Sequence, residues 1–335
     1  MRFGFLLLGD LSDFGYFEVR NLLDSFTTSE EVMRDGRILI LDTREEPGEG
    51  FFKRLAMVRE TFNHHASVDL SEVEKAVNEL DIRGKRVCVR VKKLRDSSKK
   101  FEFKSTDLEK KLGEILWRKG NRIDLRNPEM VVKVYVSSLC HVGILNSITE
   151  TKQFLERRPD KKPFFKPGAL LPRFARSLIN ITGIKEGAIL DPMCGTGTVL
   201  VEAGLMGLKF VGVEGYRWIA EGCMRNLRYY NLPSNIMLGD ARNLPFQDSS
   251  FNAVVTDYPY LRSSKSIGKI EELYENSLAE ISRILRGGRR AVLVTNINLE
   301  RFEEIKNFQI ENVLLQRVHK NLERKIYIVL NKKTG

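Results

Sequence analysis

Two short motifs contain the residues whose types and spacing are best suited to chemistry. The first reads Asp-Pro-Met-Cys-Gly-Thr-Gly-Thr over residues 191–198 and directly follows an apolar run. The second reads Asp-Tyr-Pro-Tyr over residues 257–260 and follows another apolar run. A glycine turn lets the backbone approach a ligand closely, and an acid beside it can accept hydrogen bonds. Together the motifs indicate an enzyme that holds a nucleoside-bearing cofactor and acts on the amino group of a base.

Four acids lie at or just past the ends of the first four strands that we expect after residue 164: Asp191, Glu214, Asp240 and Asp257. Open α/β sheets bind ligands at the carboxyl ends of their strands. Glu214 follows Gly195 by about 20 residues, the spacing at which an acid accepts hydrogen bonds from ribose hydroxyls. We expect Asp240 to accept from an adenine amine. A helix cap explains any one of these acids, but it is the weaker explanation for four in corresponding places.

The glycine pattern selects among cofactors. A dinucleotide fingerprint needs a third glycine, and Leu200 stands at that position. S-adenosylmethionine (SAM) has a sulfonium cation and no pyrophosphate, so an acid-rich site suits it better than a phosphate cradle does. The candidate cofactor-binding residues are Asp191, Cys194, Gly195, Thr196, Gly197, Thr198, Glu214, Gly215, Asp240, Ala241 and Asp257.

The second motif supplies the candidate catalytic residues Asp257, Tyr258, Pro259 and Tyr260. Asp257 can accept one N–H of a base amino group, and the Tyr258 carbonyl can accept the other, because Pro259 restricts the residue before it. Two acceptors stabilise the positive charge that grows on the nitrogen. Tyr260 offers a flat face on which a base can stack. A plain turn with a core tyrosine is the alternative, and the first motif makes it the less favoured one.

Length and charge indicate more than one domain and a polyanionic partner. A chain of 335 residues is long for a single core. Residues 1–82 contain nine basic and seventeen acidic residues, whereas residues 83–133 contain seventeen basic and seven acidic ones. We expect the basic block to bind a polyanion. No apolar run approaches the length of a membrane span, so we expect a cytoplasmic protein with no membrane partner.

The four cysteines are widely spaced and form no CxxC pair. They are Cys88, Cys140, Cys194 and Cys223. We interpret them as reduced, mostly buried thiols; a disulfide or a zinc site is the less favoured alternative. We therefore expect chemistry that uses no metal.

The elements that position these motifs follow from hydrophobic spacing. In the first half we expect strands at residues 3–8, 37–42, 85–92 and 131–136, and helices at 14–26, 54–62, 71–80 and 106–119. Ser71 with Glu74, and Thr106 with Glu109, have the spacing of capping boxes. Residues 150–163 are polar and contain two prolines, so they are the best candidate for a linker.

The second half alternates strands and helices. We expect strands at residues 188–190, 210–213, 236–238, 252–256 and 291–295, and a helix at 271–285 that stops at Gly287 and Gly288. This alternation predicts a parallel, doubly wound α/β sheet. Residues 310–318 and 325–330 are β-rich runs joined by a polar turn, and they predict an antiparallel hairpin at the end of that sheet.

The chain resembles a known family. Residues 191–198 and 257–260 resemble the two motifs of class I amino methyltransferases, and the segment Phe164–Asn180 is similar to the lead-in of tRNA guanine-N2 methyltransferases. Residues 111–116 and 122–129 resemble the THUMP RNA-binding domain, and residues 54–60 are similar to the ferredoxin-like domain that accompanies it. The chain as a whole resembles the archaeal tRNA guanine-10 N2-methyltransferases.

The resemblance implies a domain order and a reaction. It implies a ferredoxin-like domain at residues 1–66, a THUMP domain at 67–149, a linker at 150–163 and a class I methyltransferase (Rossmann-like) domain at 164–335. It implies SAM as the methyl donor, guanine-10 of tRNA as the acceptor, and one or two transfers to N2. The candidate RNA-binding residues, several of them in the basic block, are Arg86, Arg90, Lys92, Lys93, Arg122, Asn127 and Arg262.

Two residues depart from the family pattern. Tyr258 replaces the usual proline, and Leu261 replaces the glycine that usually precedes Arg262 and Ser263. A backbone acceptor at residue 258 survives any side chain, so we expect the chemistry to persist. Both side chains are bulkier than the usual residues and could alter the pocket and the choice of nucleotide or the number of methylations.

Other interpretations remain open. The same enzyme class acts on adenine or cytosine of DNA or on ribosomal RNA, although the basic block and Asn127-Pro128 favour structured RNA. The chain is alternatively an RNA-binding module with a silent methyltransferase fold, against which the intact Gly195, Gly197, Asp257 and Pro259 argue. Eukaryotic relatives need a small zinc-binding partner, and the apolar residues of the C-terminal hairpin would offer a surface for one.

Overall fold

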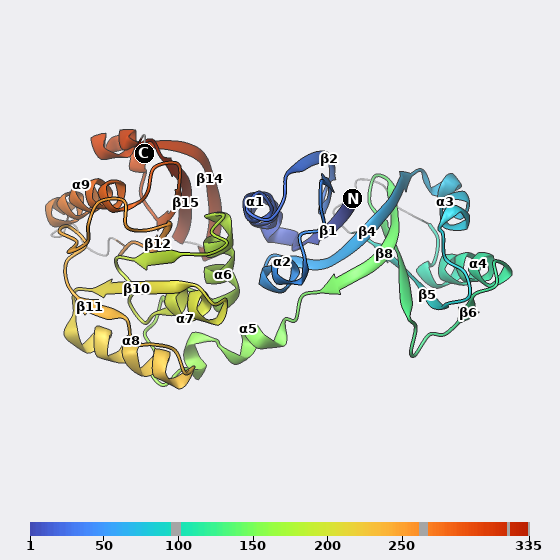
Figure 1. Cartoon of the computed structure of the whole chain (residues 1–335), viewed down its shortest axis with the longest axis horizontal. Helices are drawn as coiled ribbons and strands as arrows, with labels where there is room; N and C mark the ends of the chain where they lie inside the picture. The colour runs from blue at the N-terminus through green and yellow to red at the C-terminus, as the bar shows by residue number, and fades with distance from the viewer. Residues whose placement is uncertain (95–101, 261–266, 320–321, 334–335) are drawn as a thin grey trace. The chain divides into compact units, whose positions relative to one another are not determined.

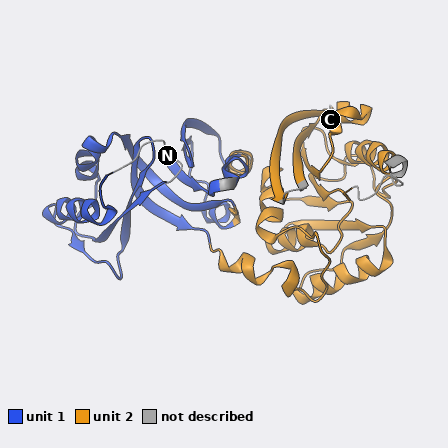
Figure 2. Ribbon diagram, turned by 180° about the vertical axis from the view of Figure 1, so that it is seen from behind, with its two compact units in different colours: residues 1–16, 27–53, 57–149 blue, residues 17–26, 54–56, 150–335 orange. Residues whose placement is uncertain are grey.

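Two α/β units make up the chain, and a computed structural model describes all residues except 95–101, 261–266, 320–321 and 334–335 (Figure 1). One unit comprises residues 1–16, 27–53 and 57–149, and the other comprises 17–26, 54–56 and 150–335 (Figure 2). The α/β class is confirmed. The predicted division of the first half into ferredoxin-like and THUMP domains stays a prediction, because one continuous sheet contains the strands of both segments.

The described residues of the first unit form an eight-stranded sheet in the order β2-β3-β1-β4-β8-β7-β5-β6. Its strands are β1 (Arg2–Leu7), β2 (Ser29–Asp35), β3 (Ile38–Thr43), β4 (Val58–Val68), β5 (Arg86–Lys93), β6 (Arg122–Ile123), β7 (Met130–Val136) and β8 (Cys140–Ile148). The helices of this half are α1 (Ser12–Leu23), α2 (Glu49–Arg54), α3 (Val73–Glu79) and α4 (Ser105–Arg118). Alternate valines of β5 pack in one core with α3, α4 and β7, as the period of two in the sequence predicts.

Two predictions for this half are wrong. Residues 54–62 are not a helix, because β4 occupies most of them and pairs on both sides, with β1 and β8. A short apolar run has no period that separates a helix from a buried strand. The capping boxes are also absent: Ser71 lies in a 3₁₀ turn before α3, Lys104 precedes α4, and Glu109 accepts a hydrogen bond from the Val91 amide at 2.8 Å. Strands β2 and β8 were not predicted.

The described residues of the second unit form a seven-stranded sheet in the order β11-β10-β9-β12-β13-β15-β14. The first five strands are parallel, and β15 and β14 are antiparallel additions, so the doubly wound sheet and its final hairpin are confirmed. The strands are β9 (Ala188–Asp191), β10 (Lys209–Glu214), β11 (Ile236–Leu238), β12 (Ala253–Asp257), β13 (Arg290–Thr295), β14 (Phe308–His319) and β15 (Leu322–Asn331).

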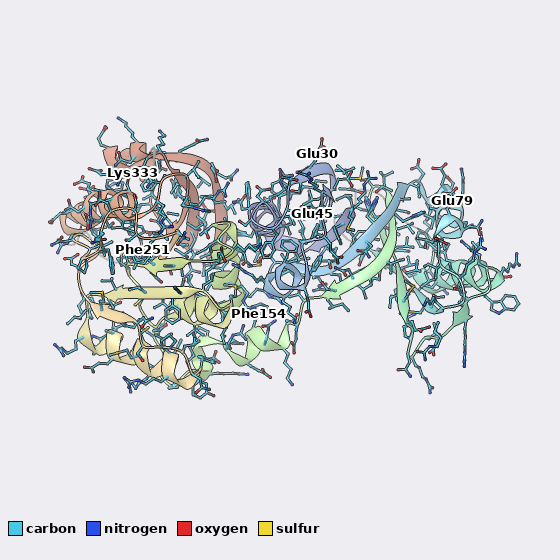
Figure 3. The ribbon with its side chains drawn as sticks, viewed as in Figure 1. Glu30, Glu45, Glu79, Phe154, Phe251 and Lys333 are labelled. Atoms are coloured by element: carbon cyan, nitrogen blue, oxygen red, sulfur yellow. The ribbon has the colours of Figure 1, made fainter. Side chains whose placement is uncertain are left out.

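Helices precede or connect these strands, and one of them lies in the predicted linker. The helices are α5 (Lys152–Glu156), α6 (Pro172–Ile181), α7 (Thr198–Leu205), α8 (Arg217–Tyr229) and α9 (Ile267–Ile284). Residues 150–163 form α5 and a 3₁₀ turn at Pro159–Lys161, and both Phe154 (Figure 3) and Pro159 are buried. The guanidinium groups of Arg157, Arg173 and Arg176 lie 5.1–5.4 Å from the centroid of the Phe154 ring. This segment therefore packs as part of the second unit rather than as a free spacer.

In the part of the chain that the structure describes, no helix combines the length and the apolar character that crossing a bilayer requires.

Candidate active site at the carboxyl edge of the parallel sheet

The strand order reverses between β9 and β12, and this is where an open α/β sheet binds its ligand. From β9 the chain proceeds to β10 and β11 on one side, and β12 and β13 lie on the other. Asp191 ends β9, Asp257 ends β12 and Glu214 ends β10, while Asp240 lies just past β11. The structure therefore places the four predicted acids along one edge of the sheet.

The glycine turn after β9 has the backbone conformation that its sequence requires. Gly195 and Gly197 adopt φ angles of 51° and 80°, in the left-handed region that favours glycine. A Cβ on Gly197 would lie 2.4 Å from Sγ of the buried Cys223, so that position excludes any side chain. A Cβ on Gly195 would meet no atom within 4 Å, so the turn is open on that side. A ligand can therefore approach the backbone at Gly195.

Glu214 joins the end of β10 to this turn. Its Oε2 accepts a hydrogen bond from the Gly195 amide at 3.1 Å, and its Oε1 accepts one from the Tyr216 amide at 2.9 Å. The residue is buried. Backbone amides thus hold the carboxylate in one orientation, and its remaining lone pairs can accept from hydroxyl groups of a ligand.

Asp191 shows how closely the acids are grouped. Burial raises its pKa to about 7, and the negative charges of Asp257 and Glu214 add to this effect, while a hydrogen bond from the Met193 amide opposes it. Three carboxyl groups from three strands therefore share one electrostatic environment. A ligand that carries positive charge is favoured there.

Asp257 is held by two side chains, one of which the sequence analysis did not identify. The Tyr260 hydroxyl donates to Oδ1 of Asp257 at 2.5 Å, and Nε of Arg324 donates to the same hydroxyl at 2.6 Å. Nη2 of Arg324 lies 3.8 Å from Oδ2 of Asp257. Burial raises the pKa of Asp257 to about 6, against the lowering effects of the Arg324 charge and the Tyr260 hydrogen bond.

The side chain of Tyr258 lies in the core and is 1% exposed. Its ring stacks on Tyr274 at a centroid distance of 4.2 Å, and its hydroxyl lies 2.9 Å from Oγ of Ser277. The bulk of the Tyr258 side chain is therefore accommodated in the core. Leu261, Arg262 and Ser263 lie outside the described residues.

Asp240 differs from the other three acids. It is exposed, and Arg242 donates to it from Nε and Nη2, at 2.9 Å and 2.7 Å to Oδ2. The hydrogen bond from Arg242 lowers the pKa of Asp240. The neighbouring Ala241 is buried, and Gly215 is exposed. Binding of an adenine amine by Asp240 stays a prediction, and it requires an oxygen of Asp240 that Arg242 also contacts.

Two residues that sequence reasoning missed, Asn226 and Lys162, connect the lead-in segment and the range just before it to the glycine turn. Asn226 of α8 is buried and donates from Nδ2 to the carbonyls of Phe164 and Thr196, both at 2.9 Å. Lys162 is also buried and donates to Oγ1 of Thr198 at 3.0 Å; burial lowers its pKa to about 8. Neither residue belongs to a motif, so only the folded chain places it at the turn.

The predicted RNA-binding residues of the first unit are only partly free to meet a ligand. Lys92 donates to Glu60 at 2.9 Å, Lys93 contacts the Phe103 carbonyl, and Arg90 donates to the Leu125 carbonyl at 3.3 Å. Arg86 lies 3.5 Å from Glu129. Arg122 and Asn127 are exposed.

In the part of the chain that the structure describes, the cysteines form no disulfide and belong to no group of metal ligands. All four cysteines are buried and free of disulfides, as predicted. Among the described residues, no three His, Cys, Asp or Glu side chains are grouped so that they could hold a metal ion. The absence of metal from the chemistry stays a prediction.

Comparisons with known proteins agree with this arrangement. A family model described as "RMKL-like, methyltransferase domain" matches residues 159–326. The chain is 35% identical over 226 residues to a Pyrococcus abyssi protein named tRNA (guanine(10)-N2)-dimethyltransferase, covering 67% of this chain and 68% of that protein. It is 30% identical over 323 residues to a protein of the same name from Methanothermobacter thermautotrophicus, covering 93% of this chain and 94% of that protein.

A more distant relative and a solved structure extend the comparison. The chain is 22% identical over 242 residues to a tRNA (guanine(6)-N2)-methyltransferase of Methanocaldococcus jannaschii, covering 58% of this chain and 63% of that protein. The crystal structure of TrmN from Thermus thermophilus matches with a TM-score of 0.54 at 17% identity, covering 98% of this chain and 99% of that one. At that identity the likeness shows the fold alone.

Proposed function

We propose, on the premise that this chain belongs to the archaeal tRNA (guanine(10)-N2)-methyltransferase family, that it transfers methyl groups from SAM to N2 of guanine-10 in tRNA. The observation that carries the proposal is the position of Asp257. It is a half-buried carboxylate at the end of β12, on the other side of the strand-order switch from the glycine turn of β9. One or two transfers give N2-methyl- or N2,N2-dimethylguanosine.

The residues at the sheet edge fit SAM. The grouped charges of Asp191, Glu214 and Asp257 favour a cationic ligand, and the turn is open at Gly195. Glu214 would hold the ribose hydroxyls, and the backbone of residues 194–198 would lie against the methionine part. When bound, SAM would supply an electrophilic methyl group, and its sulfur would keep the electron pair of the broken S–CH₃ bond as S-adenosylhomocysteine leaves.

Asp257 acts on the acceptor. The amino group of guanine is a poor nucleophile because its lone pair is delocalised into the ring. Oδ2 of Asp257 and the Tyr258 carbonyl each accept one N–H, which favours a more tetrahedral nitrogen and stabilises its developing positive charge. The neutral amine attacks, and the N2 proton then leaves to Asp257 while the new N–C bond is retained. A carboxyl group whose pKa is about 6 is ionised at neutral pH and can hold that proton.

The first unit is proposed to hold the tRNA by its phosphates. Arg122, Arg126 and Asn127 are exposed in and after β6, within the segment that resembles THUMP. Contacts of this kind set affinity and orientation without reading bases. If a small zinc-binding partner is needed, we expect it on the edge strand β14, where Leu315 and Val318 are exposed. A tRNA substrate is consistent with the expected cytoplasmic location.

The test is methylation of defined transcripts. Purified protein is incubated with SAM that carries a labelled methyl group and with a tRNA transcript, and the nucleosides are identified by mass spectrometry. A matched transcript with adenine in place of guanine-10 is the control. Label in N2-methylated guanosine that disappears in the control supports the proposal.

Other outcomes contradict parts of the proposal. Label that persists in the control would move the target, for example to guanine-6, on which the more distant relative is named to act. Label only in ribosomal RNA or DNA would change the substrate class. If the protein binds SAM but transfers no methyl group to any nucleic acid, the remaining interpretation is an RNA-binding module with a silent methyltransferase fold.

A further inference from the structure

Arg324 connects the candidate catalytic motif to the C-terminal hairpin. It lies on β15, is 7% exposed, and uses each guanidinium nitrogen. Nε donates to the Tyr260 hydroxyl at 2.6 Å, Nη1 to Oε1 of Gln316 at 3.3 Å, and Nη2 to the Gly168 carbonyl at 3.4 Å. A buried charge is costly unless it is paired and hydrogen-bonded. Arg324 is thus directed toward the motif by partners on β14, in the lead-in and in the motif itself.

The register of the sheet explains why Arg324 faces Asp257. Asp257 pairs with Val294 of β13, and Val294 pairs with Ile326 of β15, so these three residues share one face of the sheet. Arg324 lies two residues before Ile326 and therefore on that same face. Gln316 is the register partner of Arg324 on β14. The antiparallel hairpin thus brings a cation to the edge at which the parallel strands place their acids.

The two oxygens of the Asp257 carboxylate have different surroundings. Oδ1 accepts the Tyr260 hydroxyl at 2.5 Å. Oδ2 lies 3.8 Å from Nη2 of Arg324, which is near enough for electrostatic attraction but too far for a hydrogen bond. The guanidinium carbon lies 5.6 Å from the centroid of the Tyr260 ring. Tyr260 is therefore fixed at its hydroxyl and flanked at its ring by the same arginine.

We propose that Arg324 is a positioning residue: through Tyr260 it fixes the Asp257 carboxylate so that Oδ2 is presented to the amino group of the base. This inference rests on the proposed function. It also revises the role expected for Tyr260, whose hydroxyl orients Asp257 in addition to any stacking of its ring. Arginine suits the task because its rigid planar fork holds Tyr260 and Gly168 in one fixed geometry, whereas the ammonium of lysine sits on a flexible stem and imposes no such geometry.

The groups that face Asp257 define what a pH profile reports. They are Tyr260 in its own loop, Arg324 on β15, Asp191 on β9 and Tyr274 on α9. The Arg324 charge lowers the pKa of Asp257, which burial raises to about 6. Loss of this charge should raise the pKa by about one unit or more, the ordinary size of an Asp–Arg effect. The acidic limb of the transfer rate should move upward with it.

The experiment compares Arg324→Gln, Arg324→Lys and Tyr260→Phe in single-turnover methylation of tRNA between pH 5 and 9. For Arg324→Gln we expect a plateau rate lower by roughly 10²-fold, the cost of a misplaced catalytic group, and an acidic limb shifted upward. Arg324→Lys keeps the positive charge, so the acidic limb of the rate should lie at its wild-type pH. The plateau rate should still be lower than in the wild type. Tyr260→Phe should lower the plateau with a smaller shift. Arg317→Gln, an exposed arginine of the same hairpin, is the matched control.

A second measurement is independent of the RNA. Titration of ¹³C-labelled aspartate carboxyls by NMR, with Asp257→Asn to assign the signal, should show a higher pKa for Asp257 in Arg324→Gln. A folded Arg324→Gln variant could be less thermostable and yet keep the wild-type plateau rate, the acidic limb of the rate and the Asp257 titration. That result would mean that Arg324 has a structural role only. If the wild type transfers no methyl group to tRNA, the proposed function fails, and the NMR titration still decides whether Arg324 governs Asp257.

Discussion

The acidic edge of the second unit and the basic strand β5 of the first unit use charge in opposite ways. At the edge, Asp191 is buried and Asp257 is half-buried, and their pKa values are raised to about 7 and about 6. Beside β5, Glu60 accepts hydrogen bonds from Lys92 at 2.9 Å and from Tyr135 at 2.7 Å, and it lies 2.6 Å from Lys133. Burial alone raises the pKa of Glu60, but these contacts outweigh it and hold the pKa at about 2.

This difference separates charge that is available to a ligand from charge that is already neutralised. The grouped carboxyl groups of the edge still lack a full complement of positive charge, so a cationic ligand stabilises them. Lys92 and Lys133 already pair with Glu60, so a phosphate would have to compete with that carboxylate for them. The net charge of a sequence block therefore does not report how much of that charge a partner meets.

The largest effect should come from Asp257→Asn. The substitution keeps the size and one acceptor but removes the charge that stabilises the nitrogen as it becomes positive. Because this stabilisation belongs to the transition state, we expect a loss of about 10²–10⁴-fold in single-turnover rate at saturating tRNA and SAM. Both ligands should still bind. A near-wild-type rate in a less stable protein would mean that Asp257 only caps a turn and has no catalytic role.

Glu60→Gln tests the neutralised region. Its folded pKa of about 2 lies below the unfolded value of about 4.5, so Glu60 adds stability above pH 4.5 that is lost as the pH falls toward 2. We expect a loss on the order of 3 kcal/mol at pH 7 and a flatter dependence of stability on pH below 4.5. Urea unfolding at several pH values measures both. Glu129→Gln, which removes an exposed pair with Arg86, should have a much smaller effect; an equal loss in both variants would argue against the buried network.

Glu214→Ala should weaken SAM binding without unfolding the protein. Loss of a carboxylate that accepts hydrogen bonds from a ligand costs about 1.5–3 kcal/mol, or roughly tenfold to a hundredfold in Kd. Titration calorimetry measures it directly. Glu221→Ala, an exposed acid on α8, should bind SAM normally. Unchanged affinity in folded Glu214→Ala would remove Glu214 from the cofactor site.

The smallest effect concerns the basic residues. Replacing the exposed Arg122 and Arg126 by alanine should lower the slope of log K for tRNA against log salt by about one for each lost phosphate contact. Replacing Arg90, Lys92 and Lys93 together should lower it less, because those side chains already have partners within the protein. Filter binding over a salt series measures both slopes. A larger change in the triple variant would mean that β5 exchanges its internal partners for phosphates.

The sequence predicted the second unit better than the first. Glycines at 195 and 197 and acids after four apolar runs are local signals, and the regular alternation of strand and helix defines the parallel order. In the first unit, the helix predicted over residues 54–62 is wrong and β8 is not predicted, because long antiparallel strands are decided by pairing with distant partners. The caps at Ser71 and Thr106 failed because a capping pattern does not decide where a helix begins.

What the sequence by itself determined is therefore the chemistry: a glycine turn with its acids, the Asp-Tyr-Pro-Tyr motif, and the family to which they belong. The tertiary structure alone decided which side chains serve that chemistry from afar. Arg324 reaches Asp257 through the register of an antiparallel hairpin, and Asn226 reaches the turn from the buried face of α8. It also decided that Tyr258 lies in the core and that Lys92 is neutralised by Glu60. Such contacts join residues far apart in the chain, and no local spacing encodes them.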